Sequence, residues 1–448
     1  MTTILEKTQE RKSSSSPHEC KLKHLLVAGI ALFALFQFAS GFLTDDRFGC
    51  DQRLRHNEIC CAHHGVNSFR IWNHETTLQG FCPYPSDKPS LPHAETDVPV
   101  HAYPPWHTAM FYFLGWMSGS ACVGLMTIVF LLSLCFIAHE CVRLSKARFE
   151  RYGLVSAVAL SLIMFNAGNC LGMLNYGVLV LAAFLLMNKA LEKDRELLAG
   201  TAWAIMMIKP QVGLLFFWPL FWHRRYRTIA TAVAICLAAT FATSRIVHES
   251  VIDLILQIPQ IGRPYGSGTI VNKILSPLFG KNVMFVIMVF FFVLTGGVTW
   301  LMRRNRDFLV ACVPVVLSIP LWTYSQAHDH VILLPLFIFM SALAFSSRRG
   351  MGRGMRIVLA WYCMMVLFTD SWSLCMGLKL FDPTGIGWIY RLVSMASQTL
   401  LIASAVLILD AVKENSRREC AGDRAQPRRD RASRDGVCDR RMMRRNMV

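Results

Sequence analysis

The chain has 448 residues, of which 54% are apolar and only 17% charged, and its formal net charge is +17. An ordinary globular protein is about 25% charged, so this composition excludes a soluble enzyme and excludes disorder except at the ends. The basic residues stand in short clusters between apolar stretches, a distribution typical of the cytoplasmic loops of membrane proteins. We therefore interpret the net charge as a consequence of membrane topology and expect no nucleic-acid partner.

Apolar runs long enough to cross a bilayer, which takes about 20 residues with a range of about 17–25, recur along the chain. We predict an all-α, polytopic integral membrane protein of about ten spans, with a transmembrane domain over 24–411. The first run has no Ala-x-Ala-like cleavage site and is expected to be a retained helix. The predicted spans are 24–43, 119–141, 153–171, 174–188, 228–244, 282–302, 308–323, 330–345, 355–376 and 387–411.

Lys and Arg predict the orientation of these spans. Dense basic clusters occupy five connections, whereas the alternate short connections 172–173, 324–329 and 377–386 hold only Lys379. The positive-inside rule then places both termini in the cytoplasm. The loops 44–105 and 245–281 are expected outside. The basic clusters are Arg143/Lys146/Arg148/Arg151, Lys189/Lys193/Arg195, Arg224/Arg225/Arg227, Arg303/Arg304/Arg306 and Arg348/Arg349/Arg353/Arg356.

The two ends of the chain are polar. Residues 1–23 contain the run Ser13–Ser16 and are expected to be a disordered cytoplasmic N-terminus. The tail 412–448 is rich in Lys and Arg, and we expect a disordered cytoplasmic arm that lies against anionic lipid headgroups.

The apolar stretch 197–222 has cytoplasmic clusters on both sides, so a single pass would invert every later loop. Two halves of about 12 residues would each reach about 18 Å, too short for a hydrocarbon core of about 30 Å. Pro210 disfavours helical backbone at Lys209. We therefore predict a broken hairpin whose tip, Lys209, points into an interior cavity.

The first outer loop is rich in cysteine and histidine. Disulfides, plain surface positions and a zinc site all remain open, with disulfides favoured. Zinc is the least favoured because no Cys-x-x-Cys or His-x3-His spacing occurs. The residues concerned are Cys50, Cys60, Cys61, Cys82, His56, His63, His64, His74, His93 and His101.

Candidate site residues concentrate on the side expected to face outward. Asp45 and Asp46 follow the first span, at a helix C-terminus where the macrodipole disfavours negative charge, so they are poor candidates for mere caps. Asp51 follows them. The segment after Tyr103-Pro104-Pro105 is aromatic, and we expect a short interfacial helix that anchors the loop.

Two later segments add polar groups to this side. The stretch from Arg263 to Lys273 is Gly-rich and basic, a composition that suits phosphate. His328, Asp329 and His330 stand between two spans, and ionisable residues at a membrane edge are functional candidates. For them we favour proton handling or phosphate contact over a metal pair.

The order of these segments resembles the GT-C-fold glycosyltransferases, and most closely the polyprenol-phosphate-dependent glycosyltransferase family 87 of α-mannosyltransferase type. The resemblance covers about residues 24–345. It rests on Tyr103-Pro104-Pro105, Leu198-Ala199-Gly200 leading to Ile208-Lys209-Pro210-Gln211, the Asn272 region, and Asp329-His330-Val331-Ile332-Leu333-Leu334-Pro335. Where the family pattern has a Gln-containing segment, this chain reads Leu174-Asn175-Tyr176-Gly177.

The resemblance implies a GT-C-like fold and an enzyme that transfers a hexose, mannose in the family, from a polyprenyl-phosphate donor to a lipid-linked or glycan acceptor. It implies that Asp45 or Asp46 is the base and that His330 belongs to the active site. Arg263, Lys273, Lys209 and His328 are then candidate partners of the donor phosphate. Neither metal nor cofactor is expected, because the polyprenyl-phosphate sugar is a co-substrate.

Three other functions are alternatives to such an enzyme. A flippase or other transporter of lipid-linked sugars should show charges buried mid-span or paired repeats, and neither is evident. A ligase or polymerase of lipid-linked glycans would also be an enzyme of the outer face. A structural scaffold would leave the Asp329-His330 segment without a role.

Overall fold

The structure is a computed structural model that describes residues 48–72, 103–146, 165–261, 283–303 and 308–322, with Leu32, Ala39, Phe42, Val331 and Ile332 besides. Within these residues every regular element is helical, as predicted. In chain order the elements are α3 (Cys50–His63), α4 (Ser68–Trp72), α5 (Pro105–Met110), η1 (Tyr112–Trp116), α6 (Gly119–Lys146), α8 (Phe165–Met173), α9 (Gly177–Glu192), α10 (Glu196–Met206), α11 (Pro210–Gly213), η2 (Leu214–Phe216), α12 (Phe217–Trp222), α13 (Tyr226–Val247), α14 (Val251–Ile261), α16 (Val283–Leu301), α17 (Phe308–Ala311) and α18 (Val313–Trp322).

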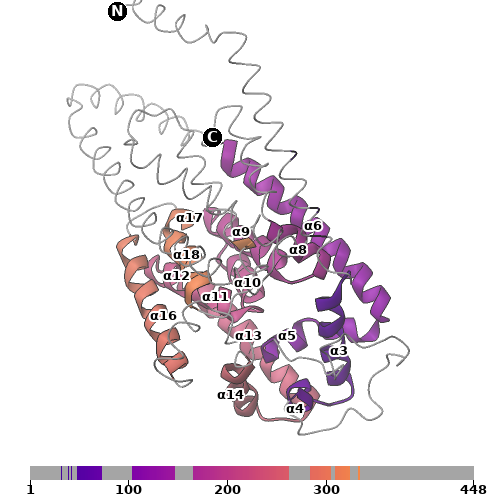
Figure 1. The fold of residues 1–448 in the computed structure, drawn as a ribbon. Coiled ribbons are helices and arrows are strands. Elements are labelled where there is room, and N and C mark those ends of the chain that lie inside the picture. The colour runs from indigo at the N-terminus through magenta and orange to yellow at the C-terminus, as the bar shows by residue number, and fades with distance from the viewer. Residues whose placement is uncertain are drawn as a thin grey trace, which may run out of the picture.

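The centre of the described bundle is α9, which packs against α6 and α10 (Figure 1). Most of its side chains are buried, among them Phe184 and Met187. On its other side α10 packs against α13, and Gly200 allows the two backbones to approach closely. A Cβ atom at Gly200 would lie only 2.7 Å from the carbonyl oxygen of Thr228. In a membrane the hydrophobic effect does not drive helices together, so association depends on van der Waals packing, and small residues allow the close approach that this packing needs.

Two helices of the described part are long and apolar enough to cross a membrane, Gly119–Cys141 within α6 and Tyr226–Val247 in α13. They correspond to the predicted spans 119–141 and 228–244. Both expose large apolar side chains, such as Leu132 and Phe241. In lipid these side chains would be buried, so the exposure agrees with the prediction of an integral membrane protein.

Of the other predicted spans, some correspond to described helices and the rest lie wholly or mostly outside the described residues. Span 174–188 corresponds to α9, which has 16 residues, and 282–302 to α16, which has 19. Span 308–323 corresponds to α17 and α18, which are separated only by Cys312. The Cys312 N–H still donates to the Phe308 carbonyl at 3.0 Å. Pro314, near the start of α18, lacks an N–H and its ring clashes with the carbonyl four residues earlier. Most of 24–43, most of 153–171, nearly all of 330–345, and the whole of 355–376 and 387–411 lie outside the described residues.

The hairpin prediction for 197–222 is confirmed at its break. Helix α10 ends at Met206, and α11 begins at Pro210 with Lys209 in a non-helical conformation between them. Two indoles donate to backbone carbonyls on the two sides of the break. The Nε1 of Trp203 donates to the Gly213 carbonyl at 2.8 Å, and that of Trp106 to the Met207 carbonyl at 2.9 Å.

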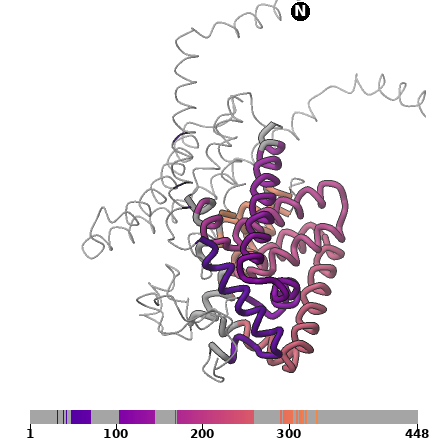
Figure 2. The backbone as a smooth tube through the Cα atoms, turned by 90° about the vertical axis from the view of Figure 1, so that its right-hand side faces the viewer, coloured from indigo at the N-terminus to yellow at the C-terminus, as the bar shows by residue number. Residues whose placement is uncertain are grey.

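Residues 48–72, part of the predicted outer loop 44–105, contain more helix than the sequence indicated. Helix α3 (indigo) runs along the bundle in Figure 2 and packs against α6 and η1. At about 1.5 Å per residue, Cys50 and Cys60 are separated by about 15 Å along α3 and cannot form a disulfide with each other. Cys82 lies outside the described residues.

Two histidines of α3 contact backbone carbonyl oxygens. The ring nitrogen Nε2 of His56 lies 3.0 Å from the Met117 carbonyl oxygen, and that of His63 lies 2.8 Å from the Tyr112 carbonyl oxygen. Within the part of the chain that the structure describes, no three His, Cys, Asp or Glu side chains are grouped closely enough to hold a metal.

Candidate functional site

Helix α3 turns polar side chains inward, which is the opposite of what an amphipathic helix usually does. Gln52, Arg55, His56 and Glu58 are buried on its inner face. A buried charge is tolerated only when it is paired with an opposite charge or hydrogen-bonded. Buried ionisable groups are concentrated at functional sites. The start of the helix is fixed by Gly49, whose N–H donates to the Gly172 carbonyl at 2.8 Å and whose φ of 73° favours glycine.

The charges on this inner face are paired along the helix. The guanidinium of Arg55 lies between two carboxylates, with its Nε 3.4 Å from Asp51 Oδ1 and its Nη1 in contact with Glu58 Oε1. The same guanidinium lies over the ring of Tyr103, 4.8 Å from its centroid. Three charged side chains of one helix are thus held together in a place with little access to water.

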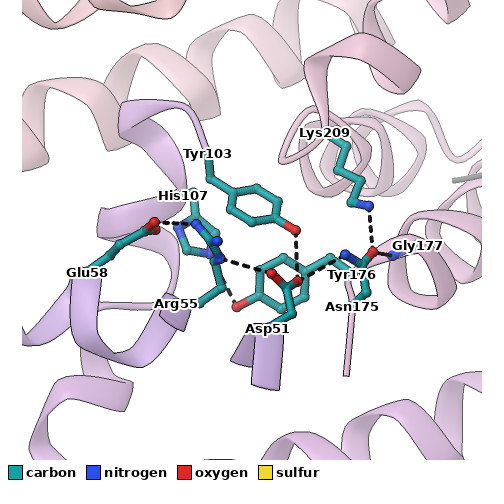
Figure 3. A network of polar contacts seen from close by, with 9 residues as sticks. All are labelled: Asp51, Arg55, Glu58, Tyr103, His107, Asn175, Tyr176, Gly177 and Lys209. Atoms are coloured by element: carbon teal, nitrogen blue, oxygen red, sulfur yellow. Dashed lines mark hydrogen bonds and ion pairs between the residues drawn. The ribbon is translucent and has the colours of Figure 1, made fainter. Parts of the chain in front are cut away.

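The carboxylate of Asp51 also binds residues from distant segments, as Figure 3 shows. Its Oδ2 accepts a hydrogen bond from Asn175 Nδ2 at 3.0 Å and one from the Tyr103 hydroxyl at 3.5 Å. The amide of Asn175 extends the chain of contacts, because its Oδ1 accepts from Lys209 Nζ at 2.5 Å and from the Gly177 N–H at 3.0 Å. One amide therefore links a carboxylate and a buried cation.

The turn between α8 and α9 explains why Asn175 is available. Leu174 has a positive φ of 53°, which ends α8, and the Asn175 side chain then binds the N–H of Gly177 two residues on. This local bond is a common way for Asn to stabilise a turn before a helix.

Aromatic rings cover the other side of these polar groups. Tyr176 is fully buried, and its hydroxyl lies 3.2 Å from His107 Nε2. The rings of Tyr103 and His107 are stacked with centroids 4.8 Å apart, and Phe111 stacks on Tyr176 at 5.2 Å. The polar groups and their aromatic cover form one assembly, which we name the Asp51 cluster: Asp51, Arg55, Glu58, Tyr103, His107, Asn175, Tyr176 and Lys209.

Of the sequence-predicted site residues, the structure places only Lys209. It points inward as predicted, is only 2% exposed, and meets Asn175 instead of an open cavity. The remaining candidates lie outside the described residues, namely Asp45, Asp46, Arg263, Lys273, His328 and His330.

Sequence reasoning missed most of the Asp51 cluster. For the segment after Tyr103 the sequence predicts a short interfacial helix that anchors the loop, yet Trp106 and His107 of α5, in its first part, are buried inside the bundle. Asn175 was noted only as a departure from a family pattern. A signal was present in α3, where Arg55 and Glu58 stand in a segment that is otherwise expected to be a loop.

A second polar group lies nearby and joins α4 to the start of α14. Asn67 Nδ2 donates to Glu249 Oε2 at 2.8 Å and to Gln257 Oε1 at 3.0 Å, and Arg70 pairs with Glu249. A narrow pocket opens beside these residues. Its lining includes Glu58 of the Asp51 cluster and Thr108 of α5.

A third group of charges lies at the other end of α6 and joins it to α9. Glu140 is 1% exposed and accepts from Lys189 Nζ at 2.5 Å and from Arg143 Nε at 2.6 Å. Arg143 also pairs with Glu192 at 2.9 Å. Burial disfavours the charged form of Arg143, but hydrogen bonds to Glu192 and Glu140 outweigh it and raise the pKa of the guanidinium. We name these four residues the Glu140 cluster.

Helices able to cross a membrane, with a cluster of charged, amide and phenol groups buried among them, define a helical membrane protein with an internal polar site. The family model described as glycosyltransferase family 87 matches residues 101–323, a range that includes Tyr103, Asn175 and Lys209. The chain belongs to this family and is a membrane glycosyltransferase. No curated protein and no solved structure matched the chain.

Proposed function

We propose that this glycosyltransferase moves a hexose, mannose by the family resemblance, from a polyprenyl-phosphate donor to a lipid-linked or glycan acceptor. The reaction takes place on the extracytoplasmic side, in a protein whose termini are both cytoplasmic. The observation that carries the proposal is the Asp51 cluster. It joins the tip of the broken hairpin, the Tyr103-Pro104-Pro105 segment and the Asn175 turn, three parts of the range that the family model matches.

The cluster supplies two features that such a reaction needs. A departing polyprenyl phosphate develops negative charge, and a fixed cation near it lowers the barrier. Lys209 is such a cation, since its position is set by Asn175 and by the break at Pro210. Arg263, Lys273 and His328 are the further phosphate partners that we propose from the sequence, and His330 adjusts hydrogen bonding at the reacting groups.

The base is Asp45 or Asp46, not Asp51. Both oxygens of Asp51 already bind protein groups, so a substrate hydroxyl would first have to displace Arg55, Asn175 or Tyr103. Asp51 therefore acts as a positioning residue. Asp45 and Asp46 precede Gly49 by only four and three residues, and Gly49 is tied to Gly172 beside this cluster.

The bond changes follow from these roles. The acceptor hydroxyl attacks the anomeric carbon, its proton goes to the carboxylate, and the bond from that carbon to the phosphate oxygen breaks. The electron pair leaves with the polyprenyl phosphate. Because one displacement takes place, the configuration at the anomeric carbon is inverted.

The alternative is a transporter or flippase of lipid-linked sugars, in which the Asp51 cluster would bind the cargo without breaking a bond. The two proposals differ in a single observable. Membranes containing the protein are incubated with a panel of polyprenyl-phosphate sugars and a mixed glycolipid acceptor fraction. Transfer from one donor to product supports the enzyme. Movement of the donor between leaflets without any product supports the transporter and contradicts our proposal.

A further inference from the structure

Helix α14 has two apolar faces, and only one of them packs against the protein. Leu254 is buried and shares a small apolar cluster with Ala62 and Val247. Roughly opposite on the helix, Ile252, Ile255 and Leu256 are 69%, 41% and 60% exposed. Residues three and four apart share one helix face, so these three side chains form a continuous apolar strip.

A second exposed apolar surface lies on η1. Trp116 is 74% exposed and Phe113 is 45% exposed. Directly before them the chain is held in place, because Tyr112 stacks on His63 with ring centroids 4.0 Å apart. Tyr112 also packs against the Ala62, Val247 and Leu254 cluster, so η1 and α14 lie at the same level of the molecule.

The surfaces of η1 and α14 lie at the ends of the two helices long enough to cross a membrane, α6 and α13. Element η1 ends at Trp116, just before α6 begins at Gly119, and α14 begins at Val251, just after α13 ends at Val247. The end of α13 is marked by His248, which has a positive φ of 55°, and Ser250 then caps α14 through a 3.1 Å bond from the Asp253 N–H. One span starts and another ends where these surfaces lie.

We propose that Phe113, Trp116, Ile252, Ile255 and Leu256 form an interfacial rim that is inserted into the lipid leaflet at this end of the spans. Aromatic side chains are favoured at the headgroup level, and an amphipathic helix lies in the membrane plane with its apolar face about 5–10 Å into the headgroup–acyl boundary. The partner is therefore the lipid surface itself. On the proposed function, the rim also holds the Asp51 cluster at the depth of a lipid-linked sugar.

The rim is tested by depth measurement in the full chain. A fluorescent amino acid is introduced at position 252, 255 or 116, one at a time, by stop-codon suppression, which avoids labelling the 15 native cysteines. The protein is placed in nanodiscs of phosphatidylcholine and phosphatidylglycerol that contain a lipid spin-labelled near the headgroup. Position 253, an exposed polar residue on the same helix, is the matched control.

We expect the spin-labelled lipid to quench positions 252, 255 and 116 about twofold more than position 253, and aqueous iodide to show the reverse order. Equal quenching at all four positions would overturn the rim. Protection of position 252 from both quenchers would also overturn it, because a second copy or another protein would then cover the strip. Neither measurement requires transfer, so the rim and the proposed function can fail separately.

Discussion

The Asp51 cluster and the Glu140 cluster are both buried and charged, yet they are built differently. In the Glu140 cluster each carboxylate meets its cations directly, and Arg143 and Glu192 are more than a third exposed. In the Asp51 cluster Arg55 pairs directly with Asp51 and Glu58, whereas a second cation, Lys209, is joined to Asp51 through the side chain of Asn175, and tyrosine and histidine rings close the site. Direct pairs between two neighbouring helices fasten those helices. An indirect arrangement across four segments fixes side-chain geometry at higher desolvation cost.

The two clusters differ in role: we assign the Glu140 cluster to stability and the Asp51 cluster to chemistry. Buried ionic groups are weak evidence for stability in general. Stability therefore does not account for the Asp51 cluster with its high desolvation cost, and we assign this cluster to sugar transfer. The Glu140 cluster has an adequate structural reason, because it ties α6 to α9 on the side that we propose faces the cytoplasm.

The largest expected effect is on Asp45 and Asp46, the two carboxylates that precede the Asp51 cluster in the sequence. Asp45→Asn or Asp46→Asn should abolish transfer while leaving membrane insertion intact, because an amide cannot accept the acceptor's proton. Loss of a positioned base slows a reaction by about 10²–10⁴-fold. Initial rates of labelled sugar transfer in membranes with matched protein levels measure this. Full activity in both single variants would remove the two residues from the mechanism.

The second prediction compares one lysine from each cluster. Lys209→Met keeps the length of the side chain and removes its charge, and should slow transfer by about 10²-fold, the usual effect of removing one fixed electrostatic group. Lys189→Met makes the same change in the Glu140 cluster and should leave the rate per folded molecule unchanged. Equal losses in the two variants would show that the clusters do not differ in function.

The third prediction concerns stability. Glu140→Gln should lower the free energy of unfolding by about 1–3 kcal/mol, because the neutral amide loses the ion pairs with Lys189 and Arg143 and leaves these cations without a counter-charge. Thermal unfolding in detergent gives the measurement, with Glu192→Gln, at the exposed edge of the same cluster, as the milder control. A Glu140→Gln protein as stable as the wild type would contradict the fastening role.

The smallest expected effect is a pH dependence at His223, which follows α12. Burial, aided by the nearby Arg225, lowers the pKa of His223 from 6.5, so the folded protein favours the neutral ring. The unfolded chain takes up the proton first as the pH falls, so stability is fully present above about pH 6.5 and declines below it. Melting temperatures at about pH 7.5 and 5.5 should differ less in His223→Gln than in the wild type. An identical difference in both would contradict this.

Sequence reasoning located some features of the fold for clear physical reasons. The hairpin break was predictable because Pro210 restricts Lys209 and basic clusters flank the segment on both sides. The spans in α6 and α13 were predictable from apolar length. The one-residue interruption at Cys312 has no separate signal in the sequence, because Pro314 stands in a run that is apolar throughout.

The candidate site was far less predictable. Asp51, Tyr103, Asn175 and Lys209 are separated by tens of residues, so no local spacing connects them, and only the packing of α3, α9 and α10 brings them together. Lys209 alone was identified, because a charged residue at the tip of an apolar hairpin is conspicuous. The inward polar face of α3 could have been found by placing Asp51, Arg55 and Glu58 on a helical period.

The most direct test of the difference between the clusters is a single transfer assay on Asp51→Asn and Glu140→Gln, each normalised to folded protein. The polyprenyl-phosphate sugar that supports wild-type transfer serves as the donor. Asp51→Asn should reduce the rate by about 10-fold or more, since its partners Arg55 and Asn175 lose the charge that orients them. Glu140→Gln should retain the wild-type rate. Wild-type transfer by Asp51→Asn would contradict the assignment of the Asp51 cluster to the active site.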